Sequence, residues 1–180
     1  MNPLVRGGTA PVFDTVALDG TLVSVPASGA WTLLSFLRYA SCPMCNLRVR
    51  ELRLRDQELK SAGVTWLAVF HSPSRRLMRY FSTEVRSHVV ADPGRVLYAR
   101  FDVGYSWWRT LASVLVPTFF WRLLKATAFG YWGGAIDHSI HSMPADFLVS
   151  PTGAIRLVHY GRHIGDHVAV SDVLTALVDD

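Results

Sequence analysis

Two cysteines, Cys42 and Cys45, lie within the stretch RYASCPMCN at residues 38–46. Thiols separated by two residues can form half of a metal site, a structural disulfide, or a redox pair that cycles between dithiol and disulfide. A disulfide needs Cα atoms about 4.4–6.8 Å apart, and two residues in the first turn of a helix meet that condition. The spacing alone therefore leaves three chemistries open.

The position of the pair favours redox chemistry. Cys42 follows the apolar run WTLLSFL at 31–37, which predicts a buried strand, and it precedes Pro43, a residue favoured at the first position of a helix. Cys42 is therefore predicted at or near a helix N-cap, where unpaired N–H groups and the helix dipole favour a thiolate and lower a cysteine pKa to about 3.5–7.5. Cys42 can then attack, and Cys45, on the same face of the first turn, can resolve the mixed disulfide.

Two other interpretations of the pair carry less weight. Zinc normally needs four ligands, and the chain has no second cysteine pair. Histidines would have to complete such a site, either His138 and His141 or His159, His163 and His167. Alternatively, two buried cysteines can pack as inert small hydrophobes.

The rest of the chain predicts alternating strands and helices. Apolar and β-branched runs, turn signals and amphipathic spacing place a hairpin at 12–25, strands at 31–37, 64–70, 88–93, 145–150 and 154–160, and helices at 46–63, 72–84, 94–103 and 168–178. Strands and helices alternate in the first part of the chain, and the last two strands form an antiparallel pair. This order predicts an α/β fold with a mixed central sheet and helices on both faces. With no internal repeat or linker, residues 1–180 are expected to form one domain.

An apolar helical insertion at about 104–135 interrupts this pattern. Its core, WWRTLASVLVPTFFWRLL at 107–124, contains Arg109, Arg122 and Pro117, which disfavour a membrane-spanning helix. We expect two short helices, bent at Pro117, over the active-site end of the fold. Such a lid could close the core, line an apolar substrate site, form a dimer interface or touch a membrane surface.

Composition and charge narrow the function further. The net charge of +4 comes from basic residues dispersed along the chain, which disfavours nucleic-acid binding. The first residues, MNPLVRGGTAPVFD, do not resemble a secretory leader, so a cytoplasmic location is expected. Thiols are kept reduced in that compartment, which argues against a structural disulfide.

The chain resembles the thioredoxin fold and, more narrowly, the peroxiredoxin-like AhpC/TSA group. FLRYASCPMCNLRVREL at 36–52 is similar to that group's pattern around Cys-Pro-x-Cys. Three later segments match in the same order: VFHSPSRRL at 69–77, VVADPGRVLYARFDV at 89–103 and DFLVSPTGAIRLVHYGRHIGDH at 146–167. The resemblance implies thiol-dependent reduction of a peroxide or a disulfide.

The resemblance also implies residue roles. Cys42 matches the attacking (peroxidatic) cysteine and Cys45 the resolving one. Pro144 matches the proline, cis in thioredoxin-like proteins, that precedes a strand facing the active site. Pro43 and Met143 adjoin these positions and are expected to support the site.

Two departures from the peroxiredoxin pattern affect the expected chemistry. Tyr39 stands where typical members have the threonine that orients the peroxide, and Ser35 stands where they have proline. Pro144 stands where they have an arginine. Arg38, four residues before Cys42, or Tyr39 could substitute in part, because a guanidinium nearby favours a thiolate. For Arg38, an exposed arginine at a strand end is an equally good interpretation.

The expected function is therefore that of an antioxidant thiol oxidoreductase, with no metal or organic cofactor. It would reduce peroxides, including bulky or lipid hydroperoxides, or protein disulfides through a Cys42/Cys45 cycle. A thioredoxin-like protein or a small thiol would supply electrons, and a homodimer is left open. The alternative is a non-catalytic redox sensor or scaffold whose aromatic insertion binds a partner or a membrane surface.

Overall fold

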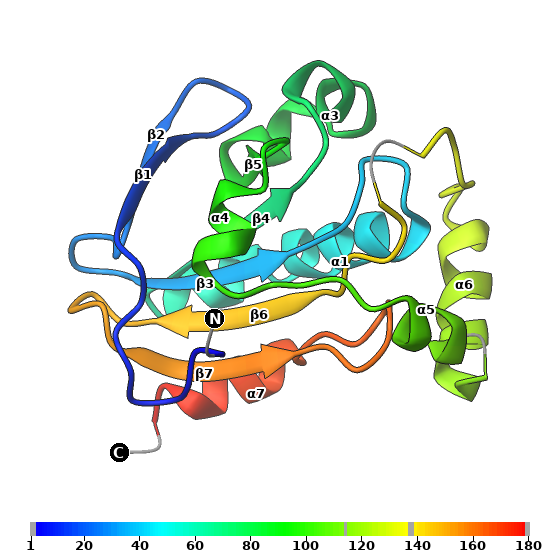
Figure 1. Ribbon diagram of the computed structural model, residues 1–180. Helices are drawn as coiled ribbons and strands as arrows, with labels where there is room; N and C mark the ends of the chain where they lie inside the picture. Colours follow the sequence, from blue (N-terminus) through cyan, green and yellow to red (C-terminus); the bar gives the residue numbers. More distant parts are fainter. Residues whose placement is uncertain (1–2, 114, 137–138, 179–180) are drawn as a thin grey trace.

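A five-stranded sheet forms the centre of the protein (Figure 1). The computed structural model describes residues 3–113, 115–136 and 139–178. In spatial order the strands are β5 (Val89–Ala91), β4 (Val64–Phe70), β3 (Trp31–Phe36), β6 (Ala145–Val149) and β7 (Ile155–Tyr160). β3, β4 and β5 are parallel, whereas β6 is antiparallel to both β3 and β7. The predicted mixed sheet is therefore confirmed, with the strand that leads to the cysteines at its centre.

The predicted N-terminal hairpin is also confirmed. β1 (Phe13–Val16) and β2 (Leu22–Val25) pair antiparallel as a separate two-stranded sheet. In the connecting turn, Gly20 has φ +93° and the Asp19 carboxylate accepts the Thr21 N–H at 3.0 Å. A positive φ is the conformation for which glycine is preferred.

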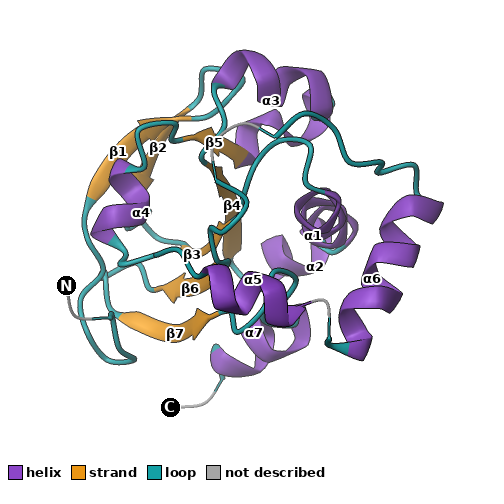
Figure 2. Cartoon of the chain, turned by 45° about the vertical axis from the view of Figure 1, so that its right-hand side comes forward, coloured by secondary structure: helices purple, strands orange, loops and turns teal. Residues whose placement is uncertain are grey.

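Helices cover both faces of the central sheet (Figure 2). They are α1 (Pro43–Leu54), α2 (Asp56–Ser61), α3 (Ser74–Tyr80), the 3₁₀ helix η1 (Thr83–His88), α4 (Val96–Arg100), α5 (Trp107–Ser113), α6 (Pro117–Ala128) and α7 (Val170–Ala176). Alternate strand residues point to opposite faces. Leu33 thus joins a core with α1, α2, α3 and α7, while Leu34 joins a second core with α4 and the hairpin.

The single helix predicted over residues 46–63 is two helices. α1 ends at Leu54, Arg55 leaves the helical conformation at φ −107° and ψ 12°, and α2 begins at Asp56. The Asp56 carboxylate accepts a hydrogen bond from the Trp66 indole of β4 at 2.8 Å. The break thus lets the second helix turn onto the sheet.

The apolar insertion forms two helices, as predicted, with Pro117 as the first residue of α6. Ala126 is fully buried, and Phe119 and Leu123 pack against the core that contains α1. α1 therefore lies between the sheet and α6 (Figure 2). Within the described part of the chain, every helix is too short or too polar to cross a bilayer. That residues 1–180 form a single domain remains a prediction.

Candidate active site

Cys42 lies at the junction between β3 and α1. It is the N-cap residue of α1, in an extended conformation with φ −68° and ψ 117°, and Pro43 occupies the first turn. The Cys42 carbonyl accepts the Asn46 N–H at 3.0 Å, the first hydrogen bond of the helix. The predicted N-cap position is confirmed, so the Cys42 sulfur lies at the positive end of the helix dipole.

Buried side chains hold the loop between β3 and α1 in place. The Ser72 hydroxyl accepts the Ala40 N–H at 2.8 Å. The Asn46 side-chain amide donates to the carbonyls of Ala40 and Cys42, both at 2.9 Å. Sequence reasoning missed Ser72 and Asn46, although an asparagine four residues after the N-cap is close enough to bond back to it.

Arg38 faces both thiols from the end of β3. Its side chain is only 4% exposed, and its Nη1 lies 3.8 Å from the Sγ of Cys42. Its main-chain N–H donates to the Sγ of Cys45 at 3.3 Å, and its Nη2 donates to the Ile140 carbonyl. The interpretation of Arg38 as an exposed arginine at a strand end is therefore wrong.

The two free thiols are buried, and their pKa values are shifted in opposite directions. Burial raises the pKa of Cys42, but the hydrogen bond from Cys45, the charge of Arg38 and the N–H groups of Cys45 and Met44 outweigh it and lower the pKa to about 6. Burial and the adjoining Cys42 thiolate raise the pKa of Cys45 well above its usual range. At neutral pH the pair therefore holds one thiolate, on Cys42, and one proton, on Cys45.

Tyr39 adjoins this pair through its main chain. Its carbonyl accepts the Cys42 N–H at 3.0 Å. The centre of its ring lies 5.2 Å from the Arg38 guanidinium carbon and 6.4 Å from the centre of the His71 ring. The ring thus helps to enclose Arg38.

Met143 and Pro144 directly precede β6, whose first residue, Ala145, pairs with Phe36 of β3. Met143 and Pro144 are both buried and line a pocket of about 500 Å³ with Tyr105, Arg109 and Tyr160, among others. The cis peptide bond of the described residues is Val25–Pro26, so the expectation of a cis bond before Pro144 is wrong. A trans bond here continues the extended chain into β6, where the Pro144 carbonyl accepts the Gly161 N–H at 2.9 Å.

A buried polar network that the sequence did not reveal joins β6 to β3 and α1. Asp146 on β6 is fully buried and accepts hydrogen bonds from Ser35 at 2.5 Å and the Val168 N–H at 3.0 Å. It also pairs with Arg48 of α1 at 3.4 Å and with His167 at 3.0 Å. Burial opposes ionisation, but these partners hold the pKa of Asp146 well below its usual range.

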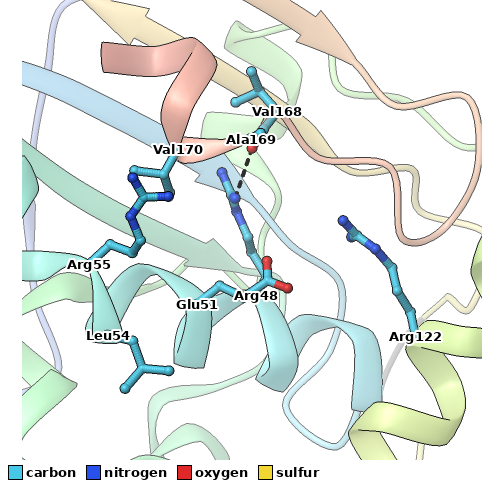
Figure 3. Close-up of a pocket in the computed structure, with 8 residues that line it drawn as sticks. All are labelled: Arg48, Glu51, Leu54, Arg55, Arg122, Val168, Ala169 and Val170. Carbon is cyan, nitrogen blue, oxygen red and sulfur yellow. Dashed lines mark hydrogen bonds between the residues drawn. The ribbon is translucent and has the colours of Figure 1, made fainter.

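This network anchors α1 to the sheet. Arg48 comes one turn after Cys45, and its Nη1 also donates to the Val168 carbonyl at 2.9 Å. Figure 3 shows this bond at the edge of a pocket of about 330 Å³ between α1, α6 and the start of α7. Neither cysteine lines that pocket, so it is a separate cavity from the thiol site.

The segment after α6 covers the cysteine loop. The Ser41 hydroxyl donates to the Ala135 carbonyl at 2.9 Å, and Arg76 donates to the same carbonyl at 2.8 Å. Cys42 is only 1% exposed. A substrate can therefore reach the Cys42 sulfur only if residues around it move.

Two of the histidines considered as zinc ligands, His167 and His159, have carboxylate partners. His167 pairs with Asp146, and the Nε2 of His159 lies 3.2 Å from a carboxylate oxygen of Asp166. His138 lies outside the described residues. Within the described ranges, no three His, Cys, Asp or Glu side chains gather closely enough to hold a metal ion.

Comparison with known proteins gives the family. Residues 51–163 match the model of the AhpC/TSA antioxidant enzyme family, a match that begins beyond the cysteine pair. Peroxiredoxin Bcp of Escherichia coli K12 is 30% identical over 105 residues, covering 57% of this chain and 67% of the relative.

Solved structures show the same fold over nearly the whole chain. Peroxidoxin BcpB of Mycobacterium tuberculosis superposes with a TM-score of 0.66 at 16% identity, covering 96% of each chain. Peroxiredoxin Q of Xanthomonas campestris gives a TM-score of 0.63 at 18% identity, covering 92% of this chain and 89% of that one. The chain belongs to the AhpC/TSA antioxidant enzyme family, and it is a thiol-dependent oxidoreductase with the thioredoxin fold of the peroxiredoxins.

Proposed function

We propose that this protein reduces hydroperoxides, with Cys42 as the attacking nucleophile and Cys45 as the resolving thiol. One observation carries the proposal: the Arg38 guanidinium lies 3.8 Å from a Cys42 sulfur whose pKa is about 6. At neutral pH such a sulfur is mostly thiolate, the form that attacks. The E. coli relative is named a peroxiredoxin, which fits this chemistry.

In the first step the Cys42 thiolate attacks the terminal oxygen of the hydroperoxide. A sulfur–oxygen bond forms, the oxygen–oxygen bond breaks, and Cys42 becomes a sulfenic acid. The departing alkoxide takes a proton from water and leaves as an alcohol, or as water when the substrate is hydrogen peroxide. The peroxide gains two electrons, and Cys42 loses them.

In the second step Cys45 attacks the oxidised sulfur. The sulfur–sulfur bond forms and the sulfenic oxygen leaves as water, taking the Cys45 proton. The raised pKa of Cys45 suits this order, because Cys45 keeps its proton until Cys42 has reacted. An external dithiol protein of the thioredoxin type, or two equivalents of a small thiol, then restores both thiols and is itself oxidised to a disulfide.

Arg38 takes the place of the polar groups that typical peroxiredoxins provide. Tyr39 and Pro144 occupy the positions where the resemblance leads one to expect threonine and arginine, and neither supplies a charge. A buried guanidinium beside the sulfur can stabilise both the thiolate and the negative charge that develops on the leaving oxygen. We therefore assign to Arg38 the electrostatic role at this site.

Disulfide reduction is the second candidate activity. It is favoured by the Cys-Pro-Met-Cys sequence at a helix N-terminus, an arrangement that also suits thiol–disulfide exchange. A non-catalytic scaffold is less well supported, because the family is one of enzymes.

Turnover of three substrates distinguishes these activities. The reduced protein would be given hydrogen peroxide and cumene hydroperoxide with a thioredoxin system coupled to NADPH oxidation, and insulin with dithiothreitol and no thioredoxin, each against the same mixture without the protein. We expect turnover of a hydroperoxide that Cys42→Ser abolishes. Turnover of insulin alone would favour the disulfide reductase, and turnover of none would contradict both.

A further inference from the structure

The insertion presents an apolar surface to solvent on the outer side of α6. Phe120, Trp121 and Leu124 are 70, 71 and 50% exposed, and their spacing places them on one face of the helix. Trp121 and Leu124 also line an apolar hollow together with Ala128, Arg122 and Lys125. The opposite face of α6 packs on the core, so the helix is apolar on both sides. A helix of that kind is normally covered on both.

The charged residues of the same segment indicate which kind of surface could cover it. Residues 103–136 contain three basic residues, Arg109, Arg122 and Lys125, and no aspartate or glutamate. Arg109 and Lys125 are exposed. Helices that lie in the interface of an anionic membrane typically combine exposed Trp, Phe and Leu with neighbouring Lys and Arg.

A second copy of the chain fits this surface less well. In a two-fold dimer the same patch of each copy would meet its equivalent. Lys125 and Arg109 would then approach their own copies with no acidic side chain from residues 103–136 to neutralise them. A phospholipid surface offers anionic phosphates to the same cations.

The surface is continuous along the chain with the thiol site. The segment after α6 carries Trp132, 72% exposed, and then Ala135, whose carbonyl accepts the Ser41 hydroxyl next to Cys42. The face of α6 opposite the apolar patch packs against α1, the helix that Cys42 caps (Figure 2). Docking through α6 would therefore bring the covering segment of the active site close to the lipid.

We propose that α5, α6 and the following segment to residue 136 dock this protein on anionic lipid bilayers. If docked in this way, the protein would act on the hydroperoxides of membrane lipids, a substrate class that rests on the proposed peroxidase function of Cys42. The apolar face enters the headgroup region, and Arg109 and Lys125 pair with lipid phosphates.

Vesicle flotation of the full chain tests the docking without any activity. The vesicles are phosphatidylcholine alone or phosphatidylcholine mixed with phosphatidylserine. We expect binding to the mixed vesicles that weakens with salt. The double variant Phe120→Glu/Trp121→Glu should bind the mixed vesicles at least about tenfold more weakly than the wild type. The double variant Arg109→Gln/Lys125→Gln should also bind the mixed vesicles at least about tenfold more weakly, but its binding to phosphatidylcholine alone should not change.

A matched control is Leu22→Glu, which places a charge on an 81% exposed leucine of the distant hairpin (Figure 1). It should bind vesicles like the wild type. Absence of wild-type binding, or equal loss in the Leu22→Glu control, would overturn the proposal. So would a dimer in size-exclusion chromatography that Phe120→Glu/Trp121→Glu converts to monomer, because the surface would then belong to a second copy.

Activity separates this proposal from the proposed function. Phe120→Glu/Trp121→Glu should reduce dissolved cumene hydroperoxide at the wild-type rate but lose most of its turnover on phospholipid hydroperoxide in mixed vesicles. Equal turnover of the vesicle substrate by variant and wild type would overturn the assigned substrate class. If no hydroperoxide is turned over, the peroxidase function fails while the flotation result still decides the docking.

Discussion

The Nη1 of Arg38 lies 3.8 Å from the Sγ of Cys42, and both side chains are almost completely buried. A charge pair screened from water in this way interacts more strongly than one at the surface. Arg38 is also held in place, because its Nη2 donates to the Ile140 carbonyl. The pairing links a residue at the end of the central strand to the reactive sulfur.

Replacing Arg38 should raise the pKa of Cys42. Arg38→Gln removes the positive charge, and we expect the pKa to rise by about one unit or more. The pH dependence of iodoacetamide alkylation measures it. Arg79→Gln, on the exposed surface of α3, is the control that should leave the pKa unchanged. An unchanged pKa in Arg38→Gln would show that the helix N-terminus and Cys45 set the acidity of Cys42 without Arg38.

The acidity of Cys42 should also make the stability of the reduced protein depend on pH. The folded pKa of about 6 lies below the unfolded value of about 8.5, so stability rises with pH between the two and this gain is lost as pH falls through 6. We expect a gain of about 2 kcal/mol from pH 6 to pH 8 relative to Cys42→Ser. Urea unfolding under reducing conditions measures it, and parallel curves for both proteins would contradict the thiolate.

Loss of the resolving thiol should stop the cycle after its first step. Cys45→Ser should accumulate sulfenic acid on Cys42, seen as one added oxygen by mass spectrometry or as a dimedone adduct. Because Cys45 also donates a hydrogen bond to Cys42, the pKa of Cys42 should be measured in the same variant. Full turnover by Cys45→Ser with the thioredoxin system alone would assign resolution to another group.

Breaking the buried ion pair should destabilise the fold strongly. Asp146→Asn leaves the Arg48 guanidinium buried without its carboxylate, and we expect a loss of about 3–5 kcal/mol in the free energy of unfolding. The matched control is Glu84→Gln, which breaks the exposed pair with Arg53 and should cost less than about 1 kcal/mol. Urea denaturation compares them, and equal losses would mean that Asp146 does not anchor α1.

The sequence was most informative where local patterns determine structure. Apolar runs predicted the strands at 31–37 and 64–70, and Pro43 predicted the start of α1, because helix starts and buried strands carry their signals in adjacent residues. The break at Arg55 was missed, since it depends on a bond between Asp56 and a tryptophan of the next strand.

Local sequence patterns could not predict contacts between residues that are far apart in the chain. Arg48 and Asp146 are 98 residues apart, and nothing in the sequence pairs them. The trans bond before Pro144 was missed for another reason, because the expectation of a cis bond came from the wider resemblance to thioredoxin-like proteins. Arg38 was named from its proximity to Cys42, but its burial emerged only from the packing around it.

The central claim is that the Cys42 and Cys45 dithiol reduces a hydroperoxide, and a single turnover without reductant tests it most directly. Fully reduced protein would be mixed with one equivalent of cumene hydroperoxide, and the alcohol and the Cys42–Cys45 disulfide would be quantified together. We predict one alcohol and one disulfide for each peroxide consumed, and neither product from Cys42→Ser. Alcohol formed by Cys42→Ser at the wild-type rate, or no peroxide consumed by the wild type, would contradict the claim.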